Sequence, residues 1–269
     1  EDWTTGGRAA LAGGITTMLD MPNNHPPIIS QATLKQKRSI VQPKALTHFD
    51  LYMGATADNV EEFLNSDAIA LKIYMGQSTG FLLVDHPNIL EKIFKRVGET
   101  DRLICVHAEN QAVLARAMAQ HGTEDHPRVH SKLRPPEAAL LAVQHALELA
   151  TQYDTRLHVC HVSTAAEVEL LKHFKSERIS SEVTPHHLFL DESALEDLGN
   201  GAKVNPPLRT LEDNVALLRA LAAGDIDVVA TDHAPHLLEE KHQSYAKAPA
   251  GVPGLETMLP LLLNAVNLS

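Results

Sequence analysis

The run Leu103-Ile104-Cys105-Val106-His107 is apolar and ends in a histidine, which is typical of a buried β-strand with a polar residue at its carboxyl end. Three other stretches place His, Asp or Glu at or beside the end of an apolar run: His158-Val159-Cys160-His161, Glu182-Val183-Thr184-Pro185-His186-His187 and Ala230-Thr231-Asp232-His233-Ala234-Pro235-His236. A fifth run, Ala70-Leu71-Lys72-Ile73-Tyr74, has a lysine inside an apolar strand. Parallel barrels build their catalytic sites from residues at the carboxyl ends of successive strands. The pattern therefore indicates both a fold and a metal-binding function.

Strand-like and helical segments alternate along the chain. The strand-like runs lie at residues 14–20, 49–54, 70–75, 103–107, 157–161, 179–183 and 228–231. Helical periodicity is found at residues 4–12, 59–64, 87–97, 111–120, 136–153, 165–174 and 211–223. This alternation predicts an α/β fold with a parallel sheet, and the number of units favours a closed (β/α)8 TIM barrel.

An open, doubly wound sheet is the alternative fold. It would need a glycine-rich phosphate turn after an early strand, and no turn has that spacing. The barrel prediction is one strand short, because seven strand-like runs are found and a closed barrel has eight. Since residues 4–12 already read as a helix, we expect the missing strand before Glu1. Residues 1–269 are expected to form a single, truncated barrel domain.

Composition narrows the class of protein. A chain of 269 residues is long enough for one such barrel. The formal net charge of −11 and the lack of a basic stripe argue against nucleic-acid binding. No apolar run approaches the roughly 20 residues of a membrane span; the longest, 258–263, is expected to be a buried helix. Two cysteines favour a reduced, cytoplasmic protein.

The candidate metal ligands are His107, His161 and Asp232, which each follow a predicted strand. Neutral imidazole is a common zinc ligand, and a carboxylate can bind a metal and also transfer a proton. Each residue has a simpler interpretation: either histidine could be an ordinary core or surface residue, and Asp232 could cap a helix. Four of the sixteen histidines, His121, His126, His130 and His242, are expected at the surface.

Lys72 is unusual because a buried ammonium group loses its hydration. A neutral amine there could react with CO2 to give an anionic carbamate that bridges two metals; pairing with a buried acid is the alternative. Cys160 and Glu182 could also reach a metal. Cys160 directly precedes His161, so in a regular strand the two side chains point to opposite faces, and we expect Cys160 to be structural.

Polar residues on the predicted loops could bind a small ligand. Asn23 and Asn205 read first as turn residues, but an amide at the mouth of a barrel can also orient a polar ligand. His236 adds a possible cation, and Gly251 would let the backbone approach a ligand closely.

Together these residues resemble the dihydroorotases, a group of metal-dependent cyclic amidohydrolases. The resemblance rests on eight motifs that occur in family order along nearly the whole chain: Met21-Pro22-Asn23, Leu71-Lys72-Ile73-Tyr74, Val106-His107-Ala108-Glu109, His158-Val159-Cys160-His161-Val162, Pro185-His186-His187-Leu188, Asn205-Pro206-Pro207-Leu208-Arg209, Thr231-Asp232-His233-Ala234-Pro235-His236 and Pro253-Gly254-Leu255-Glu256-Thr257. One such motif would be weak, but eight in register are specific.

The resemblance implies a role for each candidate. Lys72 would be a carboxylated lysine that bridges two zinc ions, with His107 and His161 as ligands of one metal. Asp232 would bind the other metal and act as the catalytic acid and base. Asn23, Asn205 and His236 would hold the substrate, and Ala250 and Gly251 would contact it through their backbone. His236 favours a substrate with a carboxylate group.

The chain departs from the family pattern at its start. The family's first strand ends in His-x-His, followed by an arginine for the substrate carboxylate, and this segment is not found here. The family's small β-rich domain is not found either. We therefore expect a fragment of a bacterial-type enzyme, lacking its first strand and C-terminal segment, with impaired activity.

The resemblance implies the reversible interconversion of L-dihydroorotate and N-carbamoyl-L-aspartate in de novo pyrimidine biosynthesis. The expected partner is this small substrate, with no nucleic acid and no membrane, and a homo-oligomer is expected. Two alternatives remain open. One is another cyclic amidohydrolase, such as an allantoinase or a dihydropyrimidinase. The other is a non-catalytic dihydroorotase-like subunit.

Overall fold

The computed structural model describes residues 1–78 and 80–268. Its strands are all parallel and occupy seven positions. They are β1 (Thr17–Asp20), β2 (His48–Leu51) with β3 (Met53–Gly54), β4 (Leu71–Tyr74), β5 (Leu103–His107), β6 (Arg156–Val159), β7 (Ile179–Val183) and β8 (Val228–Val229). The predicted TIM-type α/β architecture is therefore confirmed, with each strand beside its successor in the chain.

One predicted strand, 49–54, is divided at Tyr52 into β2 and β3. Before this residue β2 pairs with β1, and after it β3 pairs with β4. The backbone N–H of Tyr52 still donates to Asp20 on the β1 side, at 3.0 Å, and Ile69 donates to Leu51 from the β4 side. The two short strands thus fill one position of a continuous curved sheet.

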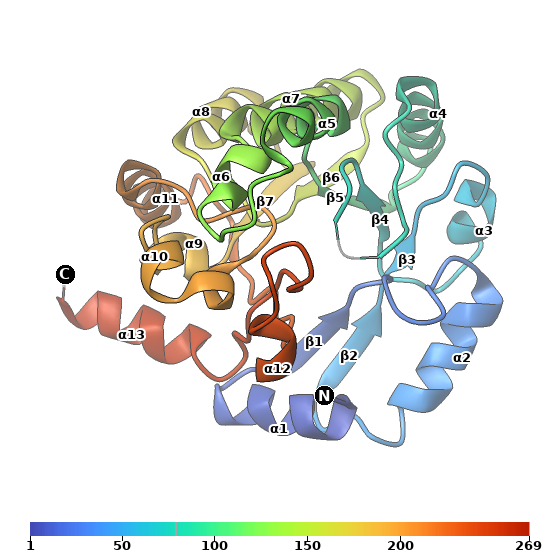
Figure 1. Ribbon diagram of the computed structural model, residues 1–269. Helices are drawn as coiled ribbons and strands as arrows, with labels where there is room; N and C mark the ends of the chain where they lie inside the picture. The colour runs from blue at the N-terminus through green and yellow to red at the C-terminus, as the bar shows by residue number, and fades with distance from the viewer. Residues whose placement is uncertain (79, 269) are drawn as a thin grey trace.

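Helices surround the strands on the outside (Figure 1). In chain order they are α1 (Trp3–Ala12), α2 (Gln31–Val41), α3 (Val60–Leu64), α4 (Pro87–Gly98), α5 (Gln111–His121), α6 (Val129–Leu133), α7 (Pro136–Gln152), α8 (Ala165–Phe174), α9 (Pro185–Phe189), α10 (Ala194–Asp197), η1 (Gly199–Ala202), α11 (Leu211–Ala223), α12 (Leu238–Lys241) and α13 (Met258–Leu268). Helix α2 was not predicted, because its sequence is mostly polar and buries only Leu34 and Val41.

Helix α4 shows why the outer layer forms. Pro87 occupies its first turn, where a missing N–H costs nothing. Leu90, Ile93, Phe94 and Val97 then recur at helical spacing and are buried. They belong to one core cluster with Leu71 and Ile73 of β4, which point outward from the sheet.

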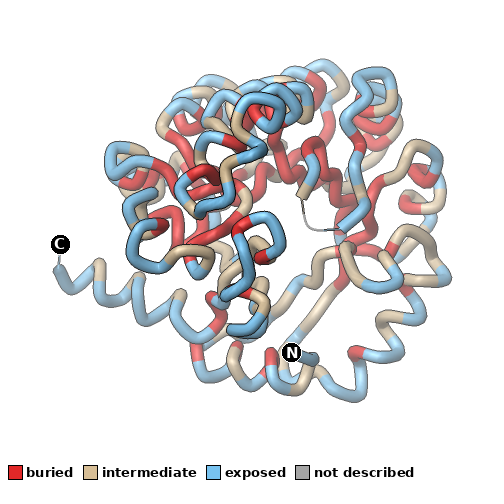
Figure 2. The backbone as a smooth tube through the Cα atoms, viewed as in Figure 1, coloured by how far each residue is buried: buried red, intermediate tan, exposed pale blue. Residues whose placement is uncertain are grey.

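The alternate strand residues face the other way, into the barrel interior. Tyr52, Ala70, Cys105 and Cys160 form a small separate cluster there. Successive strand side chains point to opposite faces, so Lys72 lies on the same interior side as Ala70. Figure 2 shows buried residues concentrated along these strands and many exposed residues on the surrounding helices.

Two edges of the sheet remain without a strand partner in residues 1–78 and 80–268. The strand order begins at β1 and ends at β8, and neither pairs with the other. Leu19 of β1 and Val228 of β8 are exposed. The position of the predicted missing strand therefore corresponds to the gap between β1 and β8.

The C-terminal helix forms as predicted, but its predicted burial is wrong. No residue of α13 is buried, and Leu263, Val266 and Leu268 are exposed. The apolar sequence indicated a core helix, whereas the described chain leaves this helix without a covering layer (Figure 2).

The core position of Phe94 can be tested by comparison with Phe81. Phe94 is fully buried, while Phe81 is 94% exposed. We expect F94A to lower the free energy of unfolding by about 3–5 kcal/mol, because it leaves a cavity. F81A should change it by less than about 0.5 kcal/mol. Urea unfolding of both variants measures this, and equal losses would contradict the assigned core.

Candidate functional site

Two histidines meet inside the barrel above the small interior cluster. The Nδ1 atom of His107, at the end of β5, lies 2.9 Å from Nε2 of His161, which follows β6. Both rings are buried, at 2% and 5% exposure. Burial lowers the pKa of each imidazole, most strongly that of His161, so both are neutral near pH 7. The two facing nitrogens now share one hydrogen bond. A metal cation could bind between the two neutral rings in place of that hydrogen.

The backbone at His161 is left-handed, with φ of +40°. Strand β6 has already ended at Val159, so the strict alternation of a strand does not continue to His161. As a result Cys160 and His161 both face the interior. The expectation that Cys160 points away is wrong, since its Sγ lies 2.9 Å from Nζ of Lys72.

Lys72 is buried and sits at the centre of this interior group. Burial lowers its pKa, but Cys160 and Tyr74 raise it, and the net pKa lies above the ordinary value. Burial also raises the pKa of the Cys160 thiol. Carbamate formation would require Lys72 as a neutral amine.

A histidine, a cysteine and a glutamate lie beneath Lys72. The ligand atoms of His158, Cys160 and Glu182 lie within 4.8 Å of one another, so this group could also hold a metal. His158 donates from Nε2 to Glu182 at 3.0 Å, and its Nδ1 lies 2.8 Å from Ser180 Oγ. The group is already linked internally by these hydrogen bonds.

A buried carboxylate orients His107. Oε2 of Glu109 lies 3.0 Å from Nε2 of His107 and accepts its hydrogen bond. Arg134 donates from Nε to the same carboxylate. Burial raises the pKa of Glu109, but Arg134 and His107 together hold it far below the ordinary value. With the proton of His107 on Nε2, the lone pair lies on Nδ1, the atom that faces His161.

Asp232 follows β8 and also has a left-handed backbone, with φ of +43°. Its side chain is reached by solvent although protein surrounds most of it. This surrounding protein raises the pKa of Asp232 to about 7, against the opposing effect of Lys72. The carboxyl group can therefore hold or release a proton near neutral pH. Its interaction with Lys72 is electrostatic rather than a direct hydrogen bond.

The predicted ligand-binding residues fall into two places. His236 donates from Nε2 to the carbonyl of Ala250 at 3.1 Å. Gly251 has φ of +135°, and a Cβ there would lie 3.0 Å from Nε2 of His236. These three residues are thus brought together, and only glycine fits at position 251.

The two asparagines lie on other loops. Oδ1 of Asn205 is buried and has no hydrogen-bond partner among the described residues. Asn23 follows β1 and lies close to Gly80. A Cβ placed on Gly80 would be 3.3 Å from the Cβ atom of Asn23. A buried acceptor without a partner is uncommon, so Asn205 is available to a ligand or water.

Comparison with known proteins decides the family. The sequence model described as "Amidohydrolase family" matches residues 1–262. The chain belongs to this family.

Curated relatives support this amidohydrolase assignment. The dihydroorotases of Methanosphaera stadtmanae and Methanosarcina acetivorans are 36% and 37% identical to this chain, and the matches include 99% of it. The chain spans about 60% of their length, with shares of 61% and 59%. Among solved structures, the L-hydantoinase (dihydropyrimidinase) of Arthrobacter aurescens has a TM-score of 0.94 and 30% identity. That match covers 100% of this chain and 62% of the other.

None of the described helices is both long enough and apolar enough to span a bilayer.

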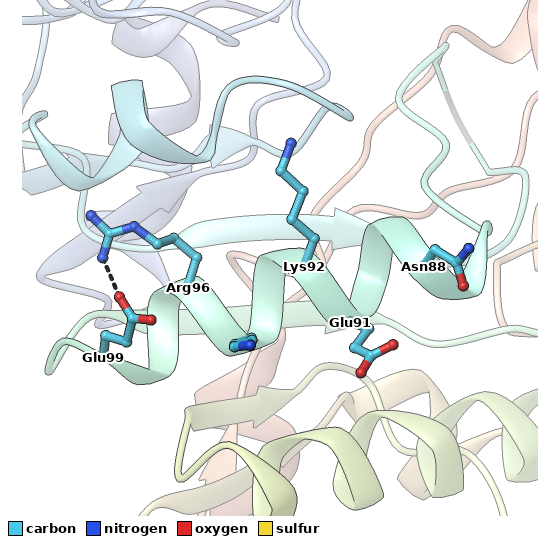
Figure 3. Close-up of a pocket in the computed structure, with 6 residues that line it drawn as sticks. Asn88, Glu91, Lys92, Arg96 and Glu99 are labelled. Carbon is cyan, nitrogen blue, oxygen red and sulfur yellow. Dashed lines mark hydrogen bonds and ion pairs between the residues drawn. The ribbon is translucent and has the colours of Figure 1, made fainter.

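One surface hollow of this amidohydrolase lies away from the strand ends. It lies along α4 and is lined by Asn88, Glu91, Lys92, Lys95, Arg96 and Glu99 (Figure 3). Arg96 pairs with Glu99 at 2.8 Å and with Glu61. These side chains come from a single solvent-facing helix and form surface ion pairs, so this hollow is not a candidate active site.

The interior residues fit a metal ion. The ring nitrogens of His107 and His161 face each other, and Nδ1 of His161 is buried without a hydrogen-bond partner in the described chain. Imidazole and carboxylate groups are the donors that zinc accepts. His107, His161 and Asp232 could therefore ligate zinc, with Lys72 beside them as a carbamate.

Sequence reasoning missed two residues of this site. Glu109 was quoted only as part of a motif, and Arg134 was not singled out. The sequence did carry a signal for Glu109, which is an acidic residue two positions after His107 at the end of a buried strand. Arg134 offered no such signal, because it reaches Glu109 from the end of α6 only in the folded chain.

The role of Glu109 can be tested through zinc affinity. We expect E109A to weaken zinc binding about 10–100-fold, because His107 loses the acceptor that fixes its tautomer. E109Q should weaken it less, since an amide can still accept the hydrogen bond. Competition with a chromophoric chelator measures the affinity, and circular dichroism confirms folding. The matched control is E137A, an exposed glutamate paired with Arg116; equal affinities for E109A and E137A would contradict the role.

Asp232 is expected to destabilise the metal-free protein. Its folded pKa of about 7 exceeds the ordinary 3.8, so the folded state retains a proton that the unfolded state releases. Stability is therefore lost as pH rises from about 4 to about 7. Because solvent reaches the side chain, we expect D232N to stabilise the chelator-treated protein by only about 1 kcal/mol at pH 8. D197N, at an exposed site, should have no effect; a less stable D232N protein would contradict the prediction.

Proposed function

We propose that this chain is the main part of a zinc-dependent dihydroorotase, which interconverts L-dihydroorotate and N-carbamoyl-L-aspartate. The observation that carries the proposal is the grouping of His236, Ala250 and Gly251 on a chain whose curated relatives are dihydroorotases. In the resemblance, the run Asp232-His233-Ala234-Pro235-His236 belongs to enzymes whose substrate has a carboxylate. A role in pyrimidine biosynthesis, a cytoplasmic location, a homo-oligomeric state and a single barrel domain belong to the same proposal.

Four residues would hold the metals. They are Lys72 as a bridging carbamate, His107 and His161 at one zinc, and Asp232 at the other. Zinc, when bound, would lower the pKa of a coordinated water and polarise an amide carbonyl. The further ligands that the family supplies as His-x-His would come from a strand in the gap between β1 and β8.

The residues of this chain would do the rest of the chemistry. Asp232 would accept a proton from the attacking water and deliver it to the leaving amide nitrogen. A carboxylate can accept and return a proton in this way. Asn205 would use its free Oδ1 atom to accept a hydrogen bond from a ring N–H of the substrate, and Asn23 would bind the ring from the opposite loop.

His236 would recognise the substrate carboxylate. In the structure its Nε2 donates to Ala250, and its Nδ1 lies 3.9 Å from Glu240 Oε2. Binding a carboxylate would exchange one of these contacts for a charge-assisted hydrogen bond. The backbone N–H of Gly251 already donates to Lys203, at 2.9 Å, so contact with this segment would require the same kind of exchange.

The main alternative is a hydantoinase or dihydropyrimidinase. The TM-score of 0.94 to the Arthrobacter aurescens enzyme is compatible with this alternative, because overall shape does not separate the two activities. An allantoinase is a further cyclic amidohydrolase to consider. A non-catalytic dihydroorotase-like subunit is another alternative, but the proposed ligands within this chain are all retained, which favours an enzyme.

Two ligands that differ in one group separate the enzymes. L-dihydroorotate and dihydrouracil share the same ring, but only dihydroorotate has a carboxylate. Because the 269-residue chain supplies only part of the metal ligands, we expect weak turnover and therefore measure binding by calorimetry with zinc and bicarbonate. Dihydroorotate should bind about 10–100-fold more tightly than dihydrouracil, as expected for one hydrogen bond to a charged group.

The same measurement on H236A should remove most of this preference. H242A, at an exposed histidine a short distance along the chain, is the control and should keep it. Equal binding of both ligands by the wild-type chain would contradict the proposal and favour the dihydropyrimidinase alternative.

A further inference from the structure

The segment that ends in Ala250 and Gly251 has little regular structure of its own. Between the end of α12 at Lys241 and Val252, the chain forms turns rather than helix or strand. Two backbone hydrogen bonds fasten its end: Gly251 donates to Lys203 and Ala234 donates to Val252, both at 2.9 Å. Figure 1 shows this segment, which follows α12, reaching toward the centre of the strands.

Lys241 ties the end of this segment to its start. The lysine is only 9% exposed, and its Nζ donates to the carbonyls of Gly251 at 2.9 Å and Pro249 at 3.0 Å. A third bond, of 3.3 Å, goes to the carbonyl of Lys203. All three hydrogens of the ammonium are thus used on main-chain oxygens. Burial and the nearby Lys203 lower the pKa of Lys241 to about 8, so the group is largely charged at neutral pH.

Lys203 holds the middle of the same segment. Its Nζ donates to the carbonyls of Tyr245 at 2.8 Å and Ala248 at 2.7 Å. The same atom lies 4.2 Å from the centre of the Tyr245 ring, a cation–π contact. Together the two lysines donate to four carbonyls of this segment and to the carbonyl of Lys203 itself.

A buried histidine anchors the group to the barrel. His130 was expected at the surface, but it is 3% exposed. Its Nδ1 lies 2.7 Å from the hydroxyl of Tyr245, and its Nε2 donates to the carbonyl of Val204 at 2.7 Å. The sequence around His130 is polar, which concealed that α6 packs under this loop.

The two buried lysines have no carboxylate at ion-pair distance in the part of the chain that the structure describes. A lysine of this burial is usually paired with an acid. Here carbonyl oxygens solvate the ammonium groups, and no negative charge at ion-pair distance among the described residues neutralises them. Their positive charge lies on the segment that touches His236, where an anionic ligand would be favoured.

We propose that Lys241, supported by Lys203, is a positioning residue that holds the main chain of residues 249–251 beside His236. This segment packs closely against its neighbours, because a Cβ at Gly251 would lie only 2.7 Å from Ala234. A shift of this segment therefore moves the carbonyl of Ala250, the partner of His236. The consequence for ligand binding rests on the proposed function, whereas the structural hold on the segment does not.

The test compares three variants of the 269-residue chain. K241M keeps the apolar stem and removes the donors, and K241R restores donors. K247M removes an exposed lysine from the same segment and is the matched control. Amide hydrogen exchange at residues 248–252, thermal unfolding and calorimetry with L-dihydroorotate are measured for each.

We expect exchange at residues 248–252 to become about tenfold faster or more in K241M, because local opening no longer breaks three hydrogen bonds. Exchange in β4, β5 and β6 should stay unchanged. Affinity for dihydroorotate should fall about tenfold, and K241R should recover a substantial part of both losses. K247M should match the wild type throughout.

Each result has a defined meaning. Exchange at residues 248–252 that is the same in K241M and K247M overturns the proposal. Uniformly faster exchange across the whole chain also overturns it, since Lys241 would then be a general stability residue. If the wild-type chain does not bind dihydroorotate, the proposed function fails, and the exchange comparison still decides the positioning role.

Discussion

The left-handed backbone at His161 and Asp232 is the constraint on which the interior site depends. A β-strand offers only alternate side chains to the barrel interior, so adjacent residues cannot both line it. At His161 the positive φ overrides this rule, and Cys160 contacts Lys72 while His161 contacts His107. Such a conformation costs a non-glycine residue roughly 1–2 kcal/mol. Two instances at candidate ligands, each at the end of a strand, are typical of strain retained for function.

Much of the architecture could be predicted from the sequence. Strands such as β5 and helices such as α4 and α11 have strong local patterns, and the strand-end positions of His107 and Asp232 followed from them. Local patterns do not record the left-handed backbone at His161, so they did not reveal that Cys160 and His161 both face the interior. Nor do they record what covers a helix: the apolar sequence of α13 gave the right element and the wrong burial. His130 shows the converse error, since its polar neighbours concealed a tertiary contact.

The two halves of the candidate site are held by different physical means. On the metal side a buried ion pair, Glu109 with Arg134, fixes the tautomer of His107. On the ligand side Lys203 and Lys241 bind main-chain carbonyls, with no acid at ion-pair distance among the described residues. The Glu109–Arg134 ion pair orients the ring of His107. The two lysines, which have no acidic partner in the described chain, hold a loop in place and also favour an anionic ligand. This division would suit the proposed active site, in which one side activates water and the other selects a carboxylate.

These two halves are also connected. Arg134 forms an ion pair with Glu109, and its guanidinium also donates to the carbonyl of Gln77. The carbonyl of Arg134 in turn accepts a hydrogen bond of 2.6 Å from Arg209. Arg209 lies on the same loop as Asn205, the residue with the unpartnered Oδ1. The orientation of His107 and the position of the Asn205 loop therefore share one arginine pair. We therefore expect a change in either half to reach the other through these hydrogen bonds, so that the metal and ligand halves respond together.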